Sequence, residues 1–354
     1  MCQRCRNQFN NLFEATGLDS TKPPVSIITH PIEISEEFDP KEWEDFWPHS
    51  AGGTIFHSLR FLDYHPEGRF EHLHLAFRRK GNMVGLITGA IRVEEGSRVW
   101  VSHPGASYGG PAFAPGLKYH QIEDAIRALI EHLRKRGIAR IRITPPPVIY
   151  SHYNDQPLDF ALWRHGFSVS RTELTQAVPL DFIDEELLLD GFVNKSRTAF
   201  RKAEREGLSF RIIDHPTQAE YDRFWVILEE NRRGLGVVPT HNREEIERLH
   251  QLVPENLMMA TVERDGEMVA VIWNFVCNEE TVLEFYMAHV ADAQIYRPVP
   301  FLTYHSLLWA KAQGYKWFDF GISSIWGDPT WGLLKFKENF RARHFLRQSF
   351  TLDL

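Results

Sequence analysis

The stretch RDGEMVAVI, residues 264–272, is typical of a β-hairpin that turns at Asp265-Gly266, because Asp-Gly favours the two-residue turns that join antiparallel strands. The stretch RKGNMVGLI, residues 79–87, has nearly the same layout, with its glycine at the corresponding place. One chain therefore carries the same hairpin pattern twice. The segments that follow each copy decide whether a whole unit is repeated.

After the first hairpin the sequence predicts a strand over 99–103, a Gly/Pro-rich loop SYGGPAFAPG and a helix over 121–136. Apolar residues recur in this helix at the spacing of one buried face: Ile122, Ala125, Ile126, Leu129, Ile130 and Leu133. Gly137 stands where a left-handed helix cap is favoured, and ARIRIT then predicts a further strand.

The second half has the same order of segments. A strand over 281–290 is followed by the loop QIYRPVP, a helix over 301–313 with Gly314 as its cap, and a strand over 315–323. We therefore expect a mixed α/β (α+β) fold built from a duplicated unit, with two domains facing each other across a shared cleft. The expected domains are residues 25–180 and 181–354, after a disordered leader over 1–24. Chance similarity of two common α/β patterns is the alternative.

Composition narrows the class of protein. A length of 354 residues suggests two domains, and a net charge of −7 argues against a protein that coats DNA. No apolar run approaches the ~20 residues of a membrane span, and three cysteines in so long a chain fit a reducing cytoplasm. Cys2 and Cys5 form a single CxxC, which predicts two reduced thiols; a zinc site is the alternative, and we expect no metal.

Six stretches carry a resemblance to a known family. They are IFHSLRFLDYH (55–65), SHPGASYGG (102–110), KSRTAFRKAEREGLSFRI (195–212), PTHN (239–242), WAKAQGYKWFDFGIS (309–323) and GLLKFKENFRAR (332–343). In this order they resemble the FemAB-like branch of the GNAT acyltransferases, in which two GNAT folds stand in tandem. The segment FRAR departs from the glycine-bearing form of its relatives.

The resemblance implies an enzyme that moves an acyl or aminoacyl group onto an amine of a cell-wall peptide or surface-glycan precursor. The donor would be aminoacyl-tRNA, which makes charged tRNA a candidate partner, or acyl-CoA, and no tightly bound cofactor is expected. The glycine-rich pyrophosphate loop of acyl-CoA enzymes has no counterpart in QIYRPVP or GPAFAPG, and Pro298 and Pro300 have no N–H to donate. A non-catalytic protein that binds a nucleotide sugar or peptide is the alternative.

Two histidines are candidates for proton transfer, since their pKa lies near operating pH. His103 follows a strand and precedes the glycine loop; we expect it at the mouth between the halves, with Tyr108 as hydrogen-bond partner and Gly109 beside the substrate. A strand-end histidine bonded to backbone is the alternative. His241 lies in a segment without counterpart in the first half; alternatively it only flanks a helix capped by Thr240 or Asn242.

Basic residues are candidates for anion binding. Arg232 and Arg233 are expected to hold an anionic acceptor. Arg197, Arg201 and Arg205 are spaced four apart on one helix and form a stripe, flanked by Lys195, that is suited to phosphates. In both cases a merely solvated position is the alternative.

The ending LLKFKENF is expected to be a strand, which would place Lys335 and Lys337 on one face. The resemblance implies an active-site lysine here, for which we choose Lys337; edge-strand lysines that discourage aggregation are the alternative. Tyr286, Tyr296 and Arg297 are expected to flank the opening through which a donor enters, although the ring of Tyr286 could simply be core. Asp319 is expected to tie down a loop.

Overall fold

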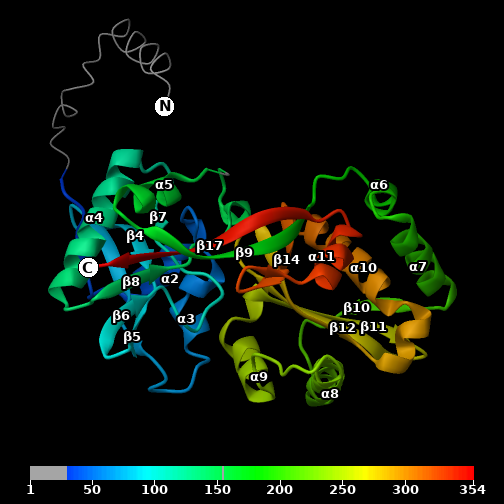
Figure 1. Ribbon diagram of the computed structural model, residues 1–354. Coiled ribbons are helices and arrows are strands. Elements are labelled where there is room, and N and C mark those ends of the chain that lie inside the picture. Colours follow the sequence, from blue (N-terminus) through cyan, green and yellow to red (C-terminus); the bar gives the residue numbers. More distant parts are fainter. Residues whose placement is uncertain (1–29, 154) are drawn as a thin grey trace, which may run out of the picture.

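The computed structural model describes residues 30–153 and 155–354; the expected leader and its two cysteines lie outside them. Two halves of mixed α/β structure lie side by side (Figure 1). None of the helices in these residues is long and apolar enough to cross a membrane.

The first half contains β1 (Glu33–Ser35), α2 (Pro40–Phe46), α3 (Leu59–Leu62), β2 (Glu71–His72), β3 (Leu75–Arg79), β4 (Asn82–Ile87), β5 (Ala90–Glu94), β6 (Ser97–Val101), β7 (Ala112–Phe113), α4 (Tyr119–Lys135), β8 (Arg140–Ile143), α5 (Pro157–Arg164) and β9 (Ser168–Pro179). The second half contains α6 (Glu185–Asp190), α7 (Asn194–Arg205), β10 (Ser209–Ile212), α8 (Gln218–Gly234), α9 (Arg243–Leu252), β11 (Leu257–Arg264), β12 (Glu267–Val276), β13 (Thr281–His289), α10 (Pro298–Ala312), β14 (Trp317–Ile322), β15 (Ser324–Ile325), β16 (Asp328–Pro329), α11 (Trp331–Glu338) and β17 (Arg343–Asp353).

The two predicted hairpins form and have the same geometry. Lys80 and Gly81 turn β3 into β4 with φ values of 53° and 81°, and Asp265 and Gly266 turn β11 into β12 with 53° and 83°. Positive φ at both turn residues is the conformation that twisted hairpins favour. Each pair also has a register shift at the corresponding place, just before the turn. The repeat that the sequence shows is therefore also present in the structure.

The helix that follows each hairpin is also in place. All six apolar residues that the sequence assigned to the buried face of α4 are buried, and Gly137 and Gly314 end α4 and α10 in the left-handed conformation. In each half the strand after the helix runs parallel to an earlier strand of the same half, β8 beside β6 and β14 beside β13.

The strands of the first hairpin do not continue into one sheet. β4 belongs to a four-stranded sheet ordered β1-β3-β4-β7, whereas β5 belongs to a sheet of eleven strands. The break falls at Gly89, where an added Cβ would lie 2.1 Å from the indole of Trp100. A side chain would not fit there, so glycine lets the backbone bend over this ring.

The halves exchange their last strands. The long sheet has the order β10-β11-β12-β13-β14-β9-β17-β8-β6-β5-β2. Thus β9, which ends the first half of the chain, pairs with β14 of the second half, while β17 pairs with β8 of the first. The two exchanged strands also pair with each other along most of their length. One continuous ladder therefore joins the halves (Figure 1).

The expected strand in LLKFKENF is wrong, because these residues form α11. Leu334 and Lys337 are buried and lie three residues apart, which is a helical spacing. Residues two apart in a helix point about 200° away from each other, so Lys335 and Lys337 do not share a face. Lys335 is exposed, whereas Lys337 points into the protein.

Candidate active site

The long sheet opens inside the second half. β13 and β14 pair only from Thr281 to Leu283 and from Trp317 to Asp319, although both strands continue beyond these residues. β13 bulges at Phe285, and β14 has a register shift between Asp319 and Ile322. Bulges are common where a sheet stops pairing beside an active site. The backbone edge of β13 past Leu283 is therefore free of β14.

The corresponding place in the first half is filled by its own loop. β6 and β8 pair over Val99–Val101, after which Ser102 N–H donates to Arg142 and Gly109 N–H donates to Thr144. A Cβ at Gly109 would lie 2.9 Å from the Ser102 carbonyl, so this glycine is needed for close packing. The loop SHPGASYGG thus closes the sheet, and Gly109 is needed for its packing; its contact with substrate stays a prediction.

Glu284, on β13 just past the last residue that pairs with β14, and Lys337 of α11 lie close enough at the open edge to influence each other's charge. Lys337 Nζ donates to the carbonyl oxygens of Gly321 and Ile322 at 2.8 and 2.9 Å. Burial lowers the pKa of Lys337 to about 8, while the nearby Glu284 opposes this change. Burial raises the pKa of Glu284 to about 7 against the positive charges of Lys337 and Arg232. Glu284 Oε2 is buried and has no hydrogen-bond partner among the described residues.

Arg232 lies near this group, whereas Arg233 does not, and anion binding by Arg232 stays a prediction. The Arg232 guanidinium lies over the ring of Tyr286, 5.7 Å from its centroid, and burial lowers its pKa. The Arg233 side chain is 70% exposed and pairs with Glu229 at 3.5 Å. The alternative of a solvated arginine therefore holds for Arg233.

His241 links the halves through two tyrosines. The Tyr286 hydroxyl lies 3.1 Å from His241 Nδ1 and also accepts from the His241 backbone N–H at 2.9 Å. The Tyr64 hydroxyl of the first half lies 3.2 Å from His241 Nε2. Burial lowers the pKa of His241 to about 4, so the imidazole is neutral near pH 7. Asn242 caps α9, as the alternative reading expected.

A hollow of about 270 Å³ lies between the halves beside His241. Four phenylalanines line it: Phe56, Phe61, Phe275 and Phe285. Its polar lining includes Tyr64, His65, Arg69, Ser107, Thr240 and Arg347. Residues from both halves thus form the shared cleft that the sequence predicted.

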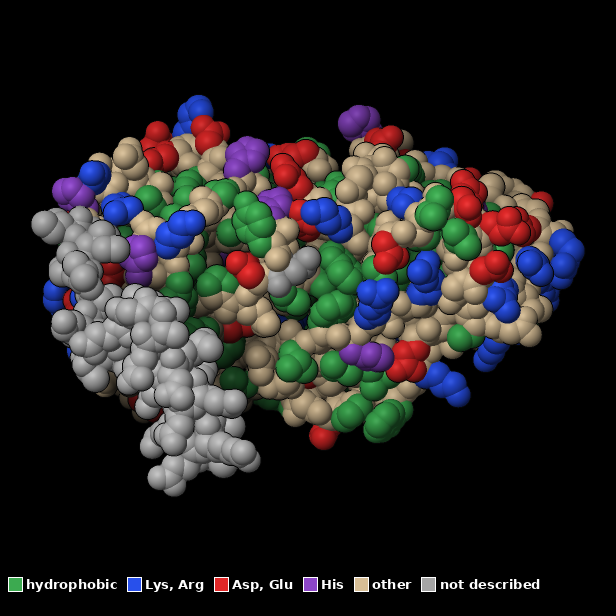
Figure 2. Space-filling model, turned by 90° about the horizontal axis from the view of Figure 1, so that it is seen from above, with side chains coloured by type: hydrophobic (Ala, Val, Ile, Leu, Met, Phe, Trp, Pro, Cys, Tyr) green, Lys and Arg blue, Asp and Glu red, His purple; other side chains and the backbone are tan. Residues whose placement is uncertain are grey.

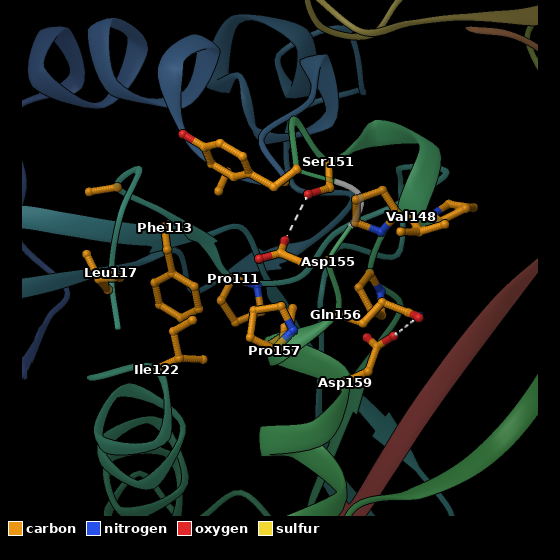
Figure 3. A pocket seen from close by; sticks show the side chains of 18 of the residues that line it. Pro111, Phe113, Leu117, Ile122, Val148, Ser151, Asp155, Gln156, Pro157 and Asp159 are labelled. Atoms are coloured by element: carbon orange, nitrogen blue, oxygen red, sulfur yellow. Dashed lines mark hydrogen bonds between the residues drawn. The ribbon is translucent and has the colours of Figure 1, made fainter. Parts of the chain in front are cut away.

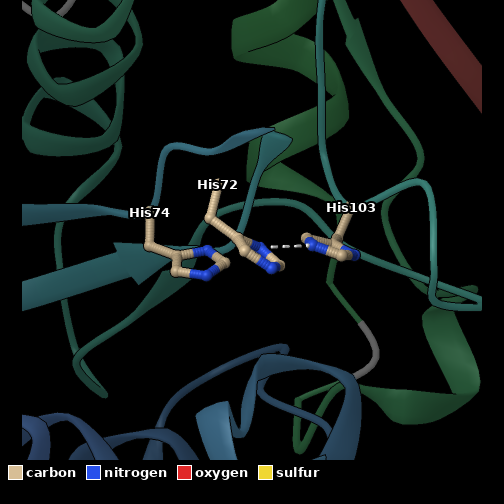
Figure 4. Close-up of side chains that lie close together, drawn as sticks. All are labelled: His72, His74 and His103. Atoms are coloured by element: carbon tan, nitrogen blue, oxygen red, sulfur yellow. Dashed lines mark hydrogen bonds between the residues drawn. The ribbon is translucent and has the colours of Figure 1, made fainter. Parts of the chain in front are cut away.

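His103 does not face this hollow; it points toward His72 and His74 (Figure 4). The three imidazoles offer nitrogen atoms within 4.8 Å of one another, a donor set that would suit zinc. However, Nδ1 of His74 and Nδ1 of His103 accept backbone N–H groups from Gly89 and Gly105, both at 3.1 Å. Their own protons therefore lie on Nε2, which leaves no lone pair there for an ion.

His103 Nε2 lies 3.1 Å from His72 Nδ1, and we assign it as the donor. Burial, with repulsion from its neighbours, lowers the pKa of His103 to about 2 and that of His74 to about 3. The alternative reading, a strand-end histidine bonded to backbone, describes His103 correctly.

Tyr108 does not bond His103. Its hydroxyl donates to Asp319 Oδ2 at 3.3 Å, beside that of Tyr150 at 2.7 Å. Asp319 Oδ1 accepts from Thr175 and from Gly321 N–H. The buried Asp319 therefore ties loops of both halves together, which confirms the role expected for it.

The remaining predicted residues lie away from the hollow. Tyr296 is covered by the Arg264 guanidinium, 3.8 Å from its ring centroid, and Arg297 is exposed with φ 63° at the start of α10. The stripe on α7, with Lys195, Arg197 and Arg201, lies at the outer end of the second half (Figure 1). Acidic side chains are interspersed with basic ones over the face shown in Figure 2.

A second hollow, of about 170 Å³, lies in the first half and contains none of the predicted residues (Figure 3). Its lining includes five prolines: Pro111, Pro145, Pro146, Pro147 and Pro157. Asp159 bonds Gln156 at 2.8 Å there, and burial raises its pKa.

Sequence reasoning missed Glu284, Tyr64, His65 and Arg347. For Glu284 there was a signal, since TVLEFYMAH is a strand pattern with one carboxylate among apolar residues. A charged residue in such a strand needs a partner or a function. For Tyr64, His65 and Arg347, the surrounding sequence contains no pattern that points to a functional site.

Comparisons with known proteins agree with this architecture. Residues 191–337 match the family of acetyltransferase (GNAT) domains. The whole fold is similar to that of FemX, with a TM-score of 0.71 at 14% identity over 91% of this chain and 97% of FemX. No curated protein is a significant match to the sequence.

Two further solved structures are similar. One is the C-terminal domain of a putative lysylphosphatidylglycerol synthetase from Agrobacterium fabrum, with a TM-score of 0.60 at 14% identity over 88% of this chain and 91% of that one. The other is a tandem GNAT protein from the clavulanic acid biosynthesis pathway. Its TM-score is 0.53 at 13% identity, over 91% of this chain and 98% of that one. The expected tandem GNAT fold is confirmed.

Proposed function

Because residues 191–337 form an acetyltransferase (GNAT) domain within a tandem GNAT fold, we propose that the protein transfers an acyl or aminoacyl group to an amine at the opening between β13 and β14. The observation that carries this proposal is the unpartnered buried carboxylate of Glu284 at the point where β13 stops pairing with β14, under the influence of the Lys337 charge. A carboxylate with a pKa of about 7 suits a general base, which works best when its pKa lies near the operating pH.

The proposed reaction needs no covalent enzyme intermediate. The acceptor nitrogen attacks the donor carbonyl carbon, and its proton passes to Glu284. The bond between the carbonyl carbon and the donor oxygen or sulfur then breaks, and the leaving atom takes the bonding pair and the proton that Glu284 accepted. Lysine has three N–H donors, and Lys337 uses two on backbone carbonyls. The third supports the negative charge that grows on the carbonyl oxygen.

The acceptor enters from the hollow between the halves, whose walls combine phenylalanine rings with hydroxyl, imidazole and guanidinium groups. An amine of a cell-wall peptide or surface-glycan precursor is the proposed acceptor. The fold of FemX and of the putative lysylphosphatidylglycerol synthetase supports acyl or aminoacyl transfer in general. The proposed donors are aminoacyl-tRNA and acyl-CoA.

The test is incubation with acyl-CoA, charged tRNA and a panel of amines, followed by mass spectrometry of the products. A new amide that Glu284→Gln abolishes and Glu338→Gln retains would support the proposal, since Glu338 is an exposed carboxylate on α11. Absence of product across donors that do bind would contradict it.

A second candidate is a binding protein without transferase activity. It is favoured by the start of α10, where Pro298 and Pro300 remove two N–H groups that could cradle a pyrophosphate. A nucleotide sugar or peptide would then raise the melting temperature with no product formed. Thermal stabilisation by CoA would instead indicate an acyl-CoA enzyme that binds the pyrophosphate in an atypical way.

A further inference from the structure

The hollow of the first half has negatively charged walls that are poor in N–H groups. Five of its lining residues are proline, which has no backbone N–H. Lysine, arginine and histidine are absent from the described residues that line it, and its charged side chains are Asp155 and Asp159. A cavity lined by charge of one sign attracts ligands of the opposite sign. These walls therefore favour a cation that brings its own hydrogen-bond donors.

Both carboxylates can accept further hydrogen bonds. Asp155 Oδ1 accepts from Ser151 Oγ at 3.3 Å, and Asp159 Oδ2 accepts from Gln156 Nε2 at 2.8 Å (Figure 3). An ionised carboxylate has about four acceptor positions, and neither of these two forms an ion pair with a described residue. The polar side chains of Ser151 and Gln156 are thus used within the wall, while acceptor positions remain for a ligand.

Asp159 is the more buried of the two acids. It is half-buried in the first turn of α5, and burial raises the pKa of its carboxyl group. A carboxylate in a first helical turn is stabilised by the helix dipole, but a buried charge without a counter-ion still costs free energy. A cation beside Asp159 would lower that cost.

The rest of the lining suits an alkyl chain. Phe113, Leu117, Ile122 and Val148 contribute apolar side chains, and burying a chain against them is favourable. The volume of about 170 Å³ is well below that of pockets for drug-sized ligands, so the ligand is small. The ring of Tyr153, 63% exposed, also lines the hollow, and the face of such a ring attracts cations.

We propose that the hollow of the first half binds a small organic cation, a primary ammonium group on a short alkyl chain. The ammonium group donates to Asp159, Asp155 adds to the attraction, and the chain lies against Phe113 and Leu117. An ammonium group has three N–H donors, and its bonds to carboxylates are charge-assisted. All the lining residues fall within 51–159, whereas β13 and β14 belong to the second half. This is therefore a second site, distinct from the one proposed for acyl transfer.

Isothermal titration calorimetry at constant ionic strength tests the site with butylammonium chloride, 1-butanol and ammonium chloride as probes. We expect butylammonium to bind at least tenfold more tightly than 1-butanol, which lacks the charge, and than ammonium, which lacks the chain. Asp159→Asn should weaken butylammonium binding at least tenfold, although the asparagine Oδ1 can still accept from Gln156. Asp155→Asn should weaken it less, because Asp155 is exposed. The matched control is Glu131→Gln, an exposed carboxylate on α4 outside the hollow, which should leave binding unchanged.

Nuclear Overhauser effects between the butyl protons and the methyl groups of Leu117 and Val148 would place the chain in the hollow. Absence of butylammonium binding, equal affinities for butylammonium and 1-butanol, or equal effects of Asp159→Asn and Glu131→Gln would overturn the proposal. Contacts confined to methyl groups outside the hollow would also overturn it. Circular dichroism checks that each variant is folded, and the comparison of probes on the wild type keeps the test valid if Asp159→Asn is not.

These measurements require no turnover. They can fail while acyl transfer stands, and acyl transfer can fail while they succeed.

Discussion

The ammonium group of Lys337 is held by the carbonyl of Gly321 at 2.8 Å, so that a helix near the end of the chain closes over the strand where the sheet opens. The contact joins α11 to β14 across a β-hairpin of six residues, 324–329. It also brings a positive charge to Glu284. The chemistry proposed for the opening depends on this contact.

Glu284→Gln should lower kcat by about 10²–10⁴-fold, the usual contribution of a general base. The wild-type rate should fall below pH 7, because the carboxyl with a pKa of about 7 must lose its proton to act. In the variant this acid limb should disappear. A pH–rate profile measures both, and an unchanged acid limb would remove Glu284 from the mechanism.

Lys337→Met should reduce turnover and also move the acid limb of the pH–rate profile upward. The reason is that the positive charge of Lys337 lowers the pKa of Glu284, so its removal raises that pKa. Lys335→Met is the control, since Lys335 is exposed on the same helix. If Lys337 has only a structural role, Lys337→Met will change the melting temperature but leave the acid limb of the pH–rate profile where it is.

Tyr286→Phe should destabilise the fold by about 1–3 kcal/mol, the cost of leaving a buried polar group unpaired. The hydroxyl serves both Nδ1 and the backbone N–H of His241, while the ring stays to pack under Arg232. Urea unfolding measures the change. In a His241→Phe background the same substitution should cost less, and equal costs in both backgrounds would show that the two side chains are not coupled.

Stability should fall as the pH drops below about 6.5, the unperturbed pKa of histidine. His103, His74 and His241 have folded-state pKa values of about 2, 3 and 4. The unfolded chain then binds more protons than the folded one, so the contribution is complete above pH 6.5 and is lost on acidification. Each such group changes the unfolding free energy by up to about 1.4 kcal/mol per pH unit.

His103→Asn tests the sign of this pH dependence. An asparagine Oδ1 can accept from Gly105 N–H as Nδ1 does, but it does not titrate. Urea unfolding between pH 5 and pH 7.5 should show a smaller slope for the variant than for wild type. A steeper slope would mean that His103 is not held neutral in the folded protein.

Much of the fold followed from local sequence. Asp265-Gly266 and Lys80-Gly81 set their turns, and the apolar spacing set the buried face of α4. The candidate site was harder to predict from the sequence. His241, Arg232, Tyr286 and Lys337, which were singled out from the sequence, lie at or beside the opening, although Lys337 was placed on a strand instead of a helix. His103 and Tyr108 were assigned to each other, and Asp319 takes Tyr108 instead.

The sequence by itself determined the repeated unit, because turn residues, helix caps and hydrophobic periodicity act within a few residues of one another. Tertiary structure alone decided that β9 and β17 exchange places and that β13 parts from β14. It also brought Arg347 beside His65, on segments far apart in the chain. Such pairings depend on which surfaces bury each other, and burial is what sets the protonation of Glu284 and Lys337.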